Sequence, residues 1–199
     1  MKILIAVPAL DTMPVQTAYC MLSLKRDCPS KFSFIVRASC QDARNMLAAE
    51  AVNTGADRVL WIDSDMAFEP DLLQRLSADI DAGWDVVSSI CFKRQLPLVP
   101  VIYETLDAET SKAEPYLDYP QDAIFPIAAC GFGAVMTTTD VIRRIGNNPF
   151  DLVGHLSEDL SFCAKATEVG ARIACDSRVK VGHVGLITYD EDMYRHPGG

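Results

Sequence analysis

The chain has 199 residues, of which 49% are hydrophobic and 23% are charged. This mixture is typical of a folded globular protein of one domain, and it excludes a disordered or fibrous chain. Acidic residues outnumber basic ones by 27 to 18, which gives a net charge of −9. Because such a chain repels phosphate backbones and anionic membranes, we expect no stable binding to nucleic acid and no membrane partner.

Seven cysteines are spread along the chain, and no two of them form a CxxC pair. An odd number without metal-ligand spacing predicts reduced thiols rather than a disulfide or zinc framework. The first apolar run, residues 3–7, is too short for a signal peptide or a membrane span. We therefore expect a buried strand there and a cytoplasmic protein. The sequence leaves open whether the chain forms a homo-oligomer.

Strand-like and helix-like patterns alternate through the first ninety residues. The predicted strands are 2–7, 31–36, 58–62 and 84–90, and the predicted helices between them are 15–24, 41–52 and 70–80. Continuous apolar strands separated by helices are typical of a mostly parallel sheet that is covered on both faces. The fold class predicted from this order is α/β, with helices flanking a central sheet.

The second half of the chain is less regular. Strands are predicted at 99–104, 124–129, 134–137, 172–175 and 179–181, with helices at 139–146 and 157–170. Residues 105–123 are polar and acidic, which indicates either an exposed excursion or a flexible loop. The polar residues 191–199 are expected to form a flexible tail or a lid.

Two carboxylates, Asp63 and Asp65, follow the apolar strand 58–62. Side chains alternate along an extended chain, so the two should point to one side at the sheet's carboxyl edge, where ligands of α/β proteins bind. A hard divalent cation takes oxygen ligands and can bridge a carboxylate to a diphosphate. Taken alone, the pair is equally compatible with a solvated strand-to-helix turn in which Asp65 is a cap.

The segment 63–65 resembles the Asp-x-Asp motif of nucleotide-sugar-dependent glycosyltransferases with the GT-A fold. Segments 43–45 and 56–66 are similar to small glycosyltransferase family 2 type proteins of bacteria and phages. Three later segments resemble that family in the right order. They are the glycine-bearing acceptor segment 130–133, the Glu-Asp motif 157–160 and the histidine-bearing strand 181–185. The resemblance covers residues 2–185 and implies a GT-A fold, Rossmann-like in its nucleotide-binding half.

The resemblance implies a metal-dependent glycosyltransferase that moves a sugar from a nucleoside diphosphate sugar, expected to be a UDP-sugar, to an acceptor hydroxyl. Inversion at the anomeric carbon is expected, with retention as the alternative. Asp65 and His183 would hold Mn²⁺ or Mg²⁺, with Asp63 on the metal or the ribose. An imidazole ligand favours Mn²⁺, and the ion would supply the positive charge that this acidic chain lacks. On its own, His183 between two glycines at a strand end is better explained as a core histidine, and the other motifs favour the metal ligand. Residues 1–190 would form one catalytic domain, with a nucleotide-binding half at 1–90 and an acceptor and catalytic half at 91–190.

The same resemblance implies that Asp159 is the general base, with Glu158 beside it in a supporting role. Read without the family, both carboxylates simply favour a helix N-terminus. Pro8 and Ala9 match the strand end that holds the nucleoside base. Arg44 either contacts the nucleotide or faces solvent from its helix.

Gly131 and Gly133 would let the backbone approach a sugar closely, although a tight turn between strands explains them almost as well. In the tail, Arg195 and His196 are candidates to close over the diphosphate.

Two other functions compete with this interpretation. A sugar nucleotidyltransferase has a similar fold but needs a glycine-rich, basic loop after its first strand, whereas residues 8–14 contain neither glycine nor lysine. An inactive nucleotide- or sugar-binding module would be expected to have lost part of the set Asp63, Asp65, Asp159 and His183, all of which are present. The acceptor, whether a glycan, a protein or a modified base, is not indicated by the sequence.

Overall fold

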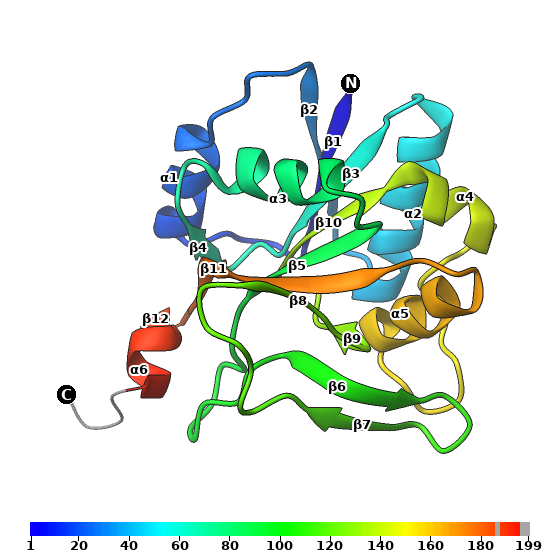
Figure 1. Ribbon diagram of the computed structural model, residues 1–199. Helices are drawn as coiled ribbons and strands as arrows, with labels where there is room; N and C mark the ends of the chain where they lie inside the picture. The colour runs from blue at the N-terminus through cyan, green and yellow to red at the C-terminus, as the bar shows by residue number, and fades with distance from the viewer. Residues whose placement is uncertain (186–187, 196–199) are drawn as a thin grey trace.

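The structure is a computed structural model that describes residues 1–185 and 188–195 (Figure 1). The first half contains β1 (Ile3–Ala9), α1 (Val15–Ser23), β2 (Ser30–Val36), α2 (Cys40–Asn53), β3 (Arg58–Ile62), β4 (Met66–Phe68), α3 (Leu72–Asp81) and β5 (Val86–Ile90). The second half contains β6 (Ile102–Asp107), β7 (Lys112–Pro115), β8 (Ile124–Pro126), β9 (Ala129–Cys130), β10 (Ala134–Thr138), α4 (Thr139–Ile145), α5 (Glu158–Glu168), β11 (Ile173–Val184), β12 (Thr188–Tyr189) and α6 (Glu191–Arg195).

The central sheet has the strand order β12-β11-β5-β10-β3-β1-β2, and β4 and β8 pair with β11 outside this path. Strand β1 runs parallel to β2 and β3, and β5 runs parallel to β11, whereas β10 is antiparallel to its neighbours β3 and β5. Helices α2, α4 and α5 cover one face, and α1 and α3 cover the other (Figure 1). The predicted α/β class with a mostly parallel sheet is confirmed.

The two faces of the sheet form two hydrophobic cores, because alternate side chains of each strand point in opposite directions. Leu4 and Trp61 belong to the core beneath α2, α4 and α5, whereas Ile5 and Leu60 belong to the core beneath α1 and α3. The continuous apolar runs of β1 and β3 are therefore the mark of strands buried on both faces.

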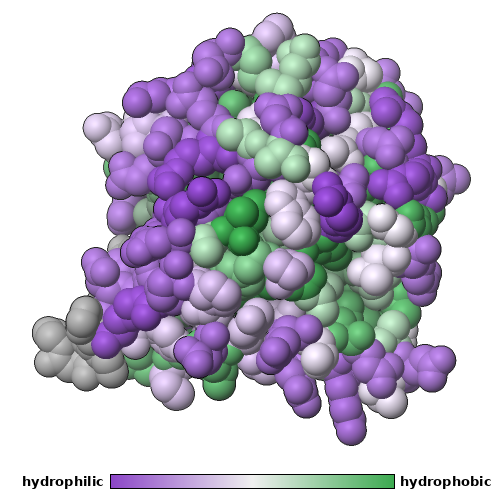
Figure 2. Space-filling model, viewed as in Figure 1, coloured by the Kyte–Doolittle hydropathy of each residue, from purple (hydrophilic) through white to green (hydrophobic). Residues whose placement is uncertain are grey.

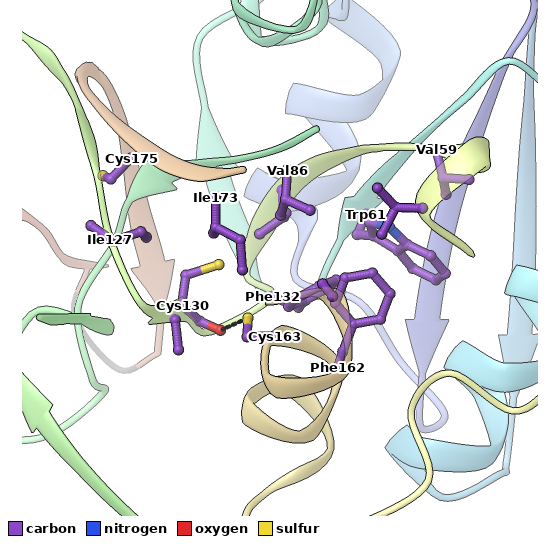
Figure 3. Packing of buried hydrophobic residues seen from close by; sticks show 14 of the residues in the cluster. Val59, Trp61, Val86, Ile127, Cys130, Phe132, Phe162, Cys163, Ile173 and Cys175 are labelled. Carbon is purple, nitrogen blue, oxygen red and sulfur yellow. Dashed lines mark hydrogen bonds between the residues drawn. The ribbon is translucent and has the colours of Figure 1, made fainter. Parts of the chain in front are cut away.

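Aromatic side chains pack against one another in the core beneath α2, α4 and α5 (Figure 3). Trp61 is fully buried, makes edge contacts with Phe132 and Phe150, and donates a hydrogen bond from its indole nitrogen to the Thr137 hydroxyl. Phe162 of α5 stacks on Phe150 with a centroid distance of 4.8 Å. This packing joins α5 to β3, so the two elements that carry the candidate site share one core.

All seven cysteines lie in the described part of the chain and are free.

Of the two alternatives for residues 105–123, an exposed excursion or a flexible loop, the structure shows an exposed excursion, and its first part is an ordered hairpin. Strands β6 and β7 form an antiparallel hairpin that adds to β9, giving a separate three-stranded sheet. The turn of the hairpin is built by Asp107, whose carboxylate accepts hydrogen bonds from the backbone of Glu109 and Thr110. Most of the hairpin is exposed, so its strands contain many polar residues and lack the apolar pattern that predicts a strand.

Between this hairpin and the central sheet, hydrophobic residues reach the surface (Figure 2) and line an open groove of about 580 Å³.

Three boundaries also differ from the prediction. The expected strand 124–129 is divided, because β8 pairs with β11 whereas β9 pairs with β6. The two strands expected within 172–181 are one strand, β11, with a register irregularity between Asp176 and Lys180. The short strand β4 was not predicted, although it pairs with β11 and has an essential place in the site.

Residues 191–195 form helix α6 rather than a flexible tail. Glu191 is buried there and pairs with Lys180 of β11 and with Arg195, and it accepts a hydrogen bond from Tyr119. Tyr194 packs its ring on Phe92 at a centroid distance of 4.9 Å. Residues 196–199 lie outside the described part of the chain. Within residues 1–185 and 188–195, no helix has the length and apolar character needed to cross a bilayer.

Candidate functional site

A pocket of about 290 Å³ opens at the carboxyl ends of β1 and β3. It brings together five of the residues singled out in the sequence, namely Pro8, Ala9, Asp63, Asp65 and His183, and its other lining residues are Leu10, Ala38, Cys40, Ala43 and Ser64. Pro8 and Ala9 end β1, and the two aspartates follow β3, so neighbouring parallel strands deliver these residues to one edge. His183 arrives from β11, much later in the chain.

Asp65 and His183 meet because β4 pairs with β11. In this antiparallel ladder Met66 lies opposite His183, and the carbonyl oxygen of Asp65 accepts a hydrogen bond from the backbone of Val184 at 2.7 Å. The His183 ring nitrogen Nε2 consequently lies 3.1 Å from Oδ2 of Asp65. The other ring nitrogen, Nδ1, lies 3.2 Å from the carbonyl oxygen of Phe92.

These contacts define what can lie between the two side chains. When Nδ1 donates its proton to the Phe92 carbonyl, Nε2 of the neutral ring has only a lone pair, which faces a carboxylate oxygen. A proton or a cation is then needed between them. Burial lowers the pKa of His183, but the hydrogen bond and charge of Asp65 outweigh it, and the net pKa is raised. Burial likewise raises the pKa of Asp65, but His183 and Arg94 outweigh it, and the net pKa is lowered.

The same pair fits a divalent cation. Neighbouring ligands of an octahedral ion, each at about 2.1 Å, lie about 3 Å apart, which matches the 3.1 Å between Nε2 and Oδ2. One imidazole and one carboxylate form a mixed set that suits Mn²⁺ better than Mg²⁺. Among the described residues, no group of three or more His, Cys, Asp or Glu side chains is arranged to bind a metal. Asp63 directs Oδ1 to Arg44 instead, at 2.9 Å.

Arg44 is buried rather than exposed to solvent, with only 3% of its side chain accessible. Its guanidinium donates to Oδ1 of Asp63 at 2.9 Å and to Oε1 of Glu158 at 2.8 Å. The rings of Phe132 and Phe150 lie 5.3 and 5.9 Å from its central carbon. Arg44 therefore connects the donor-side carboxylate to the N-terminus of α5, a role that the sequence reading did not anticipate.

A signal for this role was present in the sequence. Arg44 shares the buried face of α2 with Leu47, Ala48 and Ala51, at helical spacing. A charged residue within an apolar stripe needs a buried partner of opposite charge. Burial raises the pKa of Asp63, Arg44 lowers it, and the net pKa is raised with a further contribution from Asp65 and Asp159.

Asp159 lies in the first turn of α5, close to the segment that carries Gly131. Its Oδ1 accepts hydrogen bonds from the backbone of Leu160 at 2.8 Å and from the hydroxyl of Ser157. A Cβ added at Gly131 would lie 3.4 Å from Oδ2 of Asp159 and 3.2 Å from Cβ of Val101. The absence of a side chain at Gly131 thus lets this segment pack closely on Val101, and it leaves Oδ2 of Asp159 beside the backbone. Ser157 occupies the N-cap position of α5, but its side chain donates to Asp159 and makes no cap hydrogen bond.

Gly133 has a packing role. Its carbonyl oxygen accepts a hydrogen bond from the backbone of Asp63 at 3.0 Å. A Cβ at this position would lie 2.8 Å from Cε of Met66 and 3.3 Å from Sγ of Cys91. The absence of a side chain therefore lets β10 approach the strand end that bears the aspartates.

Arg94 is a site residue that the sequence reading missed. It follows β5 at the same edge of the sheet and donates from Nη1 to Oδ2 of Asp65 at 2.9 Å. The available signal was the basic pair 93–94, which is separated from a buried strand by two residues. Arg195 pairs with Glu191 and Tyr119 rather than with a residue of the pocket. His196 lies outside the described residues.

The sequence matches no family model and no curated protein. Many solved structures share the fold, including the A197 protein from STIV and GalNAc-T7. The A197 protein from STIV has a TM-score of 0.69 at 18% identity, and the match covers 93% of this chain and 86% of that one. GalNAc-T7, crystallised with UDP, GalNAc and Mn²⁺, has a TM-score of 0.65 at 11% identity, and the match covers 93% of this chain and 43% of that one. The chain therefore has the GT-A-type α/β fold that its sequence predicted.

Proposed function

We propose that the protein is a glycosyltransferase that moves a sugar from a nucleoside diphosphate sugar, with a UDP-sugar as the expected donor, to an acceptor hydroxyl. The observation that carries this proposal is the pair Asp65–His183, whose two donor atoms lie 3.1 Å apart beside a pocket at the strand ends. A structure of the same fold contains UDP and Mn²⁺, which supports this class of ligand.

Asp65 and His183 would hold the cation, Mn²⁺ or Mg²⁺. When bound, the ion would neutralise the leaving diphosphate as a Lewis acid. The carbonyl of Phe92 would keep the imidazole in the tautomer that presents Nε2. Asp63 would contribute its remaining carboxylate oxygen to the metal or the ribose, and Pro8 and Ala9 would border the nucleoside base.

Asp159 would act as general base. Its Oδ1 is held by two hydrogen bonds, so the carboxylate has a defined direction, and Oδ2 lies toward Gly131. Oδ2 would take the proton of the acceptor hydroxyl as that oxygen attacks the anomeric carbon and the nucleoside diphosphate leaves. Attack opposite the leaving group inverts the configuration. Glu158 would support the base indirectly, because its charge is paired with Arg44.

Residues 1–190 would act as one catalytic domain, with 1–90 as the donor half and 91–190 as the acceptor half. Arg44 spans these halves, since it binds Asp63 on one side and Glu158 on the other. The free thiols fit a cytoplasmic location.

The first test is thermal unfolding with UDP, GDP, CDP, ADP or dTDP, each with Mn²⁺ or with a chelator. A ligand at a hundred times its Kd adds about 2.7 kcal/mol to the free energy of unfolding. At about 2–4 °C per kcal/mol, the expected rise in Tm is about 5–10 °C with UDP and Mn²⁺, and the chelator removes it. No rise with any nucleotide would overturn the proposal.

A second measurement separates the enzyme from an inactive binding module. The release of UDP from several UDP-sugars is followed with simple glycosides or water as the acceptor. Wild-type protein should release UDP in a metal-dependent manner. If the protein binds UDP but releases no UDP from any of the UDP-sugars, the assignment of the nucleotide site stands and the transferase activity is refuted.

A further inference from the structure

The candidate metal site has a second cation on the same atom. Arg94 Nη1 lies 2.9 Å from Oδ2 of Asp65, and this oxygen is also the one 3.1 Å from Nε2 of His183. Oδ2 is the oxygen assigned above to a divalent ion. In the protein without ligand, the guanidinium therefore gives Oδ2 the positive partner that the divalent ion would provide when bound.

Arg94 is able to leave this position. Half of its side chain is exposed, and in residues 1–185 and 188–195 its side chain donates to Asp65 alone. The backbone beneath it is fixed, because Lys93 donates to the carbonyl of Val99 and Phe92 forms a β-bridge with Pro100. A change of partner would thus need rotation of one long side chain and no movement of the chain.

The charge of the pocket lining indicates that a bound diphosphate would need a further cationic side chain. Among its described lining residues are two aspartates and no lysine or arginine. Arg44 behind the pocket is buried and already paired with Asp63 and Glu158. A diphosphate beside Asp63 and Asp65 would need positive charge beyond that of one divalent ion. The guanidinium of Arg94 already contacts the lining residue Asp65, and its forked donors have the geometry that recognises phosphate oxygens.

We propose that Arg94 is a diphosphate-binding residue that changes partners. Without ligand it pairs with Asp65, and when a cation binds Asp65 and His183 it is displaced by like charge and donates to the phosphates of the nucleotide. This inference rests on the proposed function, because it needs a metal–nucleotide ligand in this pocket.

The test is isothermal titration calorimetry on Arg94→Gln and Arg94→Lys, with Mn²⁺ alone and with UDP in saturating Mn²⁺. Loss of charged hydrogen bonds to the phosphates should weaken UDP binding about 10- to 100-fold in Arg94→Gln, with Arg94→Lys between. Mn²⁺ alone should bind Arg94→Gln as tightly as wild type or several-fold more tightly, because a competitor for Oδ2 is gone. The matched control is Arg143→Gln, an exposed arginine on α4 outside the pocket, which should change neither affinity.

The different responses of the two affinities, a fall for UDP and no fall for Mn²⁺, distinguish this role from a structural one. If Arg94 only held Asp65 in place, both affinities would fall together, and that result would overturn the inference. Unchanged UDP affinity in Arg94→Gln would also overturn it while the proposed function stands. Wild-type protein that binds neither Mn²⁺ nor UDP would refute both. Because Arg94 is half-exposed, the variants should fold, and unfolding curves check this.

Discussion

Replacing Arg44 with methionine tests whether the buried ion triad organises the site. Methionine retains much of the aliphatic volume between Phe132 and Phe150 but removes the charge and both hydrogen bonds. Removing one partner of a buried ion pair costs about 3–5 kcal/mol, because the remaining charge is left without compensation. Here Asp63 and Glu158 keep 28% and 22% of their side-chain surface accessible, so water can partly solvate them. The expected loss is therefore at the lower end, about 3 kcal/mol.

Urea unfolding at pH 7 measures this loss directly, and the corresponding fall in Tm is about 6–12 °C. The matched control is Arg37→Met, which breaks an ion pair with Asp11 whose side chains are 82% and 58% accessible. An exposed pair contributes at most about 1 kcal/mol. Adding Glu158→Gln to Arg44→Met should restore part of the stability, because it removes an unpaired charge.

Two results would refute this reasoning. One is an Arg44→Met variant no less stable than Arg37→Met, which would mean that the triad is hydrated in solution. The other is a double variant whose losses simply add, which would mean that Arg44 and Glu158 are not coupled.

Three further predictions concern the base, a buried acid and a glycine. Asp159→Asn should lower turnover about 10²–10⁴-fold while calorimetry finds UDP affinity unchanged, and full turnover would exclude Asp159 as the base. Burial, then the hydrogen bond and charge of Asp176, raise the pKa of Asp79 to about 6. The folded state therefore retains a proton that the unfolded state loses above its ordinary pKa of 3.8, so this group makes the free energy of unfolding fall by about 1–3 kcal/mol as pH rises from 4 to 7. Urea unfolding of Asp79→Asn should lack this fall, and an unchanged slope would contradict the assignment. Gly133→Ala places a Cβ 2.8 Å from Cε of the buried Met66 and should cost about 1–3 kcal/mol in urea unfolding, whereas a neutral result would mean that the core repacks freely.

The sequence by itself determined the features that depend on local pattern. Apolar runs such as 3–7 and 58–62 are buried on both faces, which requires helices above and below and so predicts the α/β layers. Parallel strands end at one edge, so the strand pattern alone placed Asp63 and Asp65 at the edge where ligands bind. The resemblance added Pro8, Ala9 and His183, and all five residues line one pocket.

Tertiary structure decided which side chains pair. Arg44 and Glu158 are 114 residues apart, and their contact exists because α2 and α5 pack on the same face of the sheet. Arg94 reaches Asp65 only because β5 and β3 end at the same edge, with β10 between them. The hairpin β6–β7 could not be predicted for a related reason. Its strands are defined by their pairing with each other, and their residues show no apolar alternation. A local sequence pattern predicts whether a residue is buried or exposed. Which residue neutralises a buried charge depends on how elements that are distant in the chain pack together, and a local pattern does not contain that information.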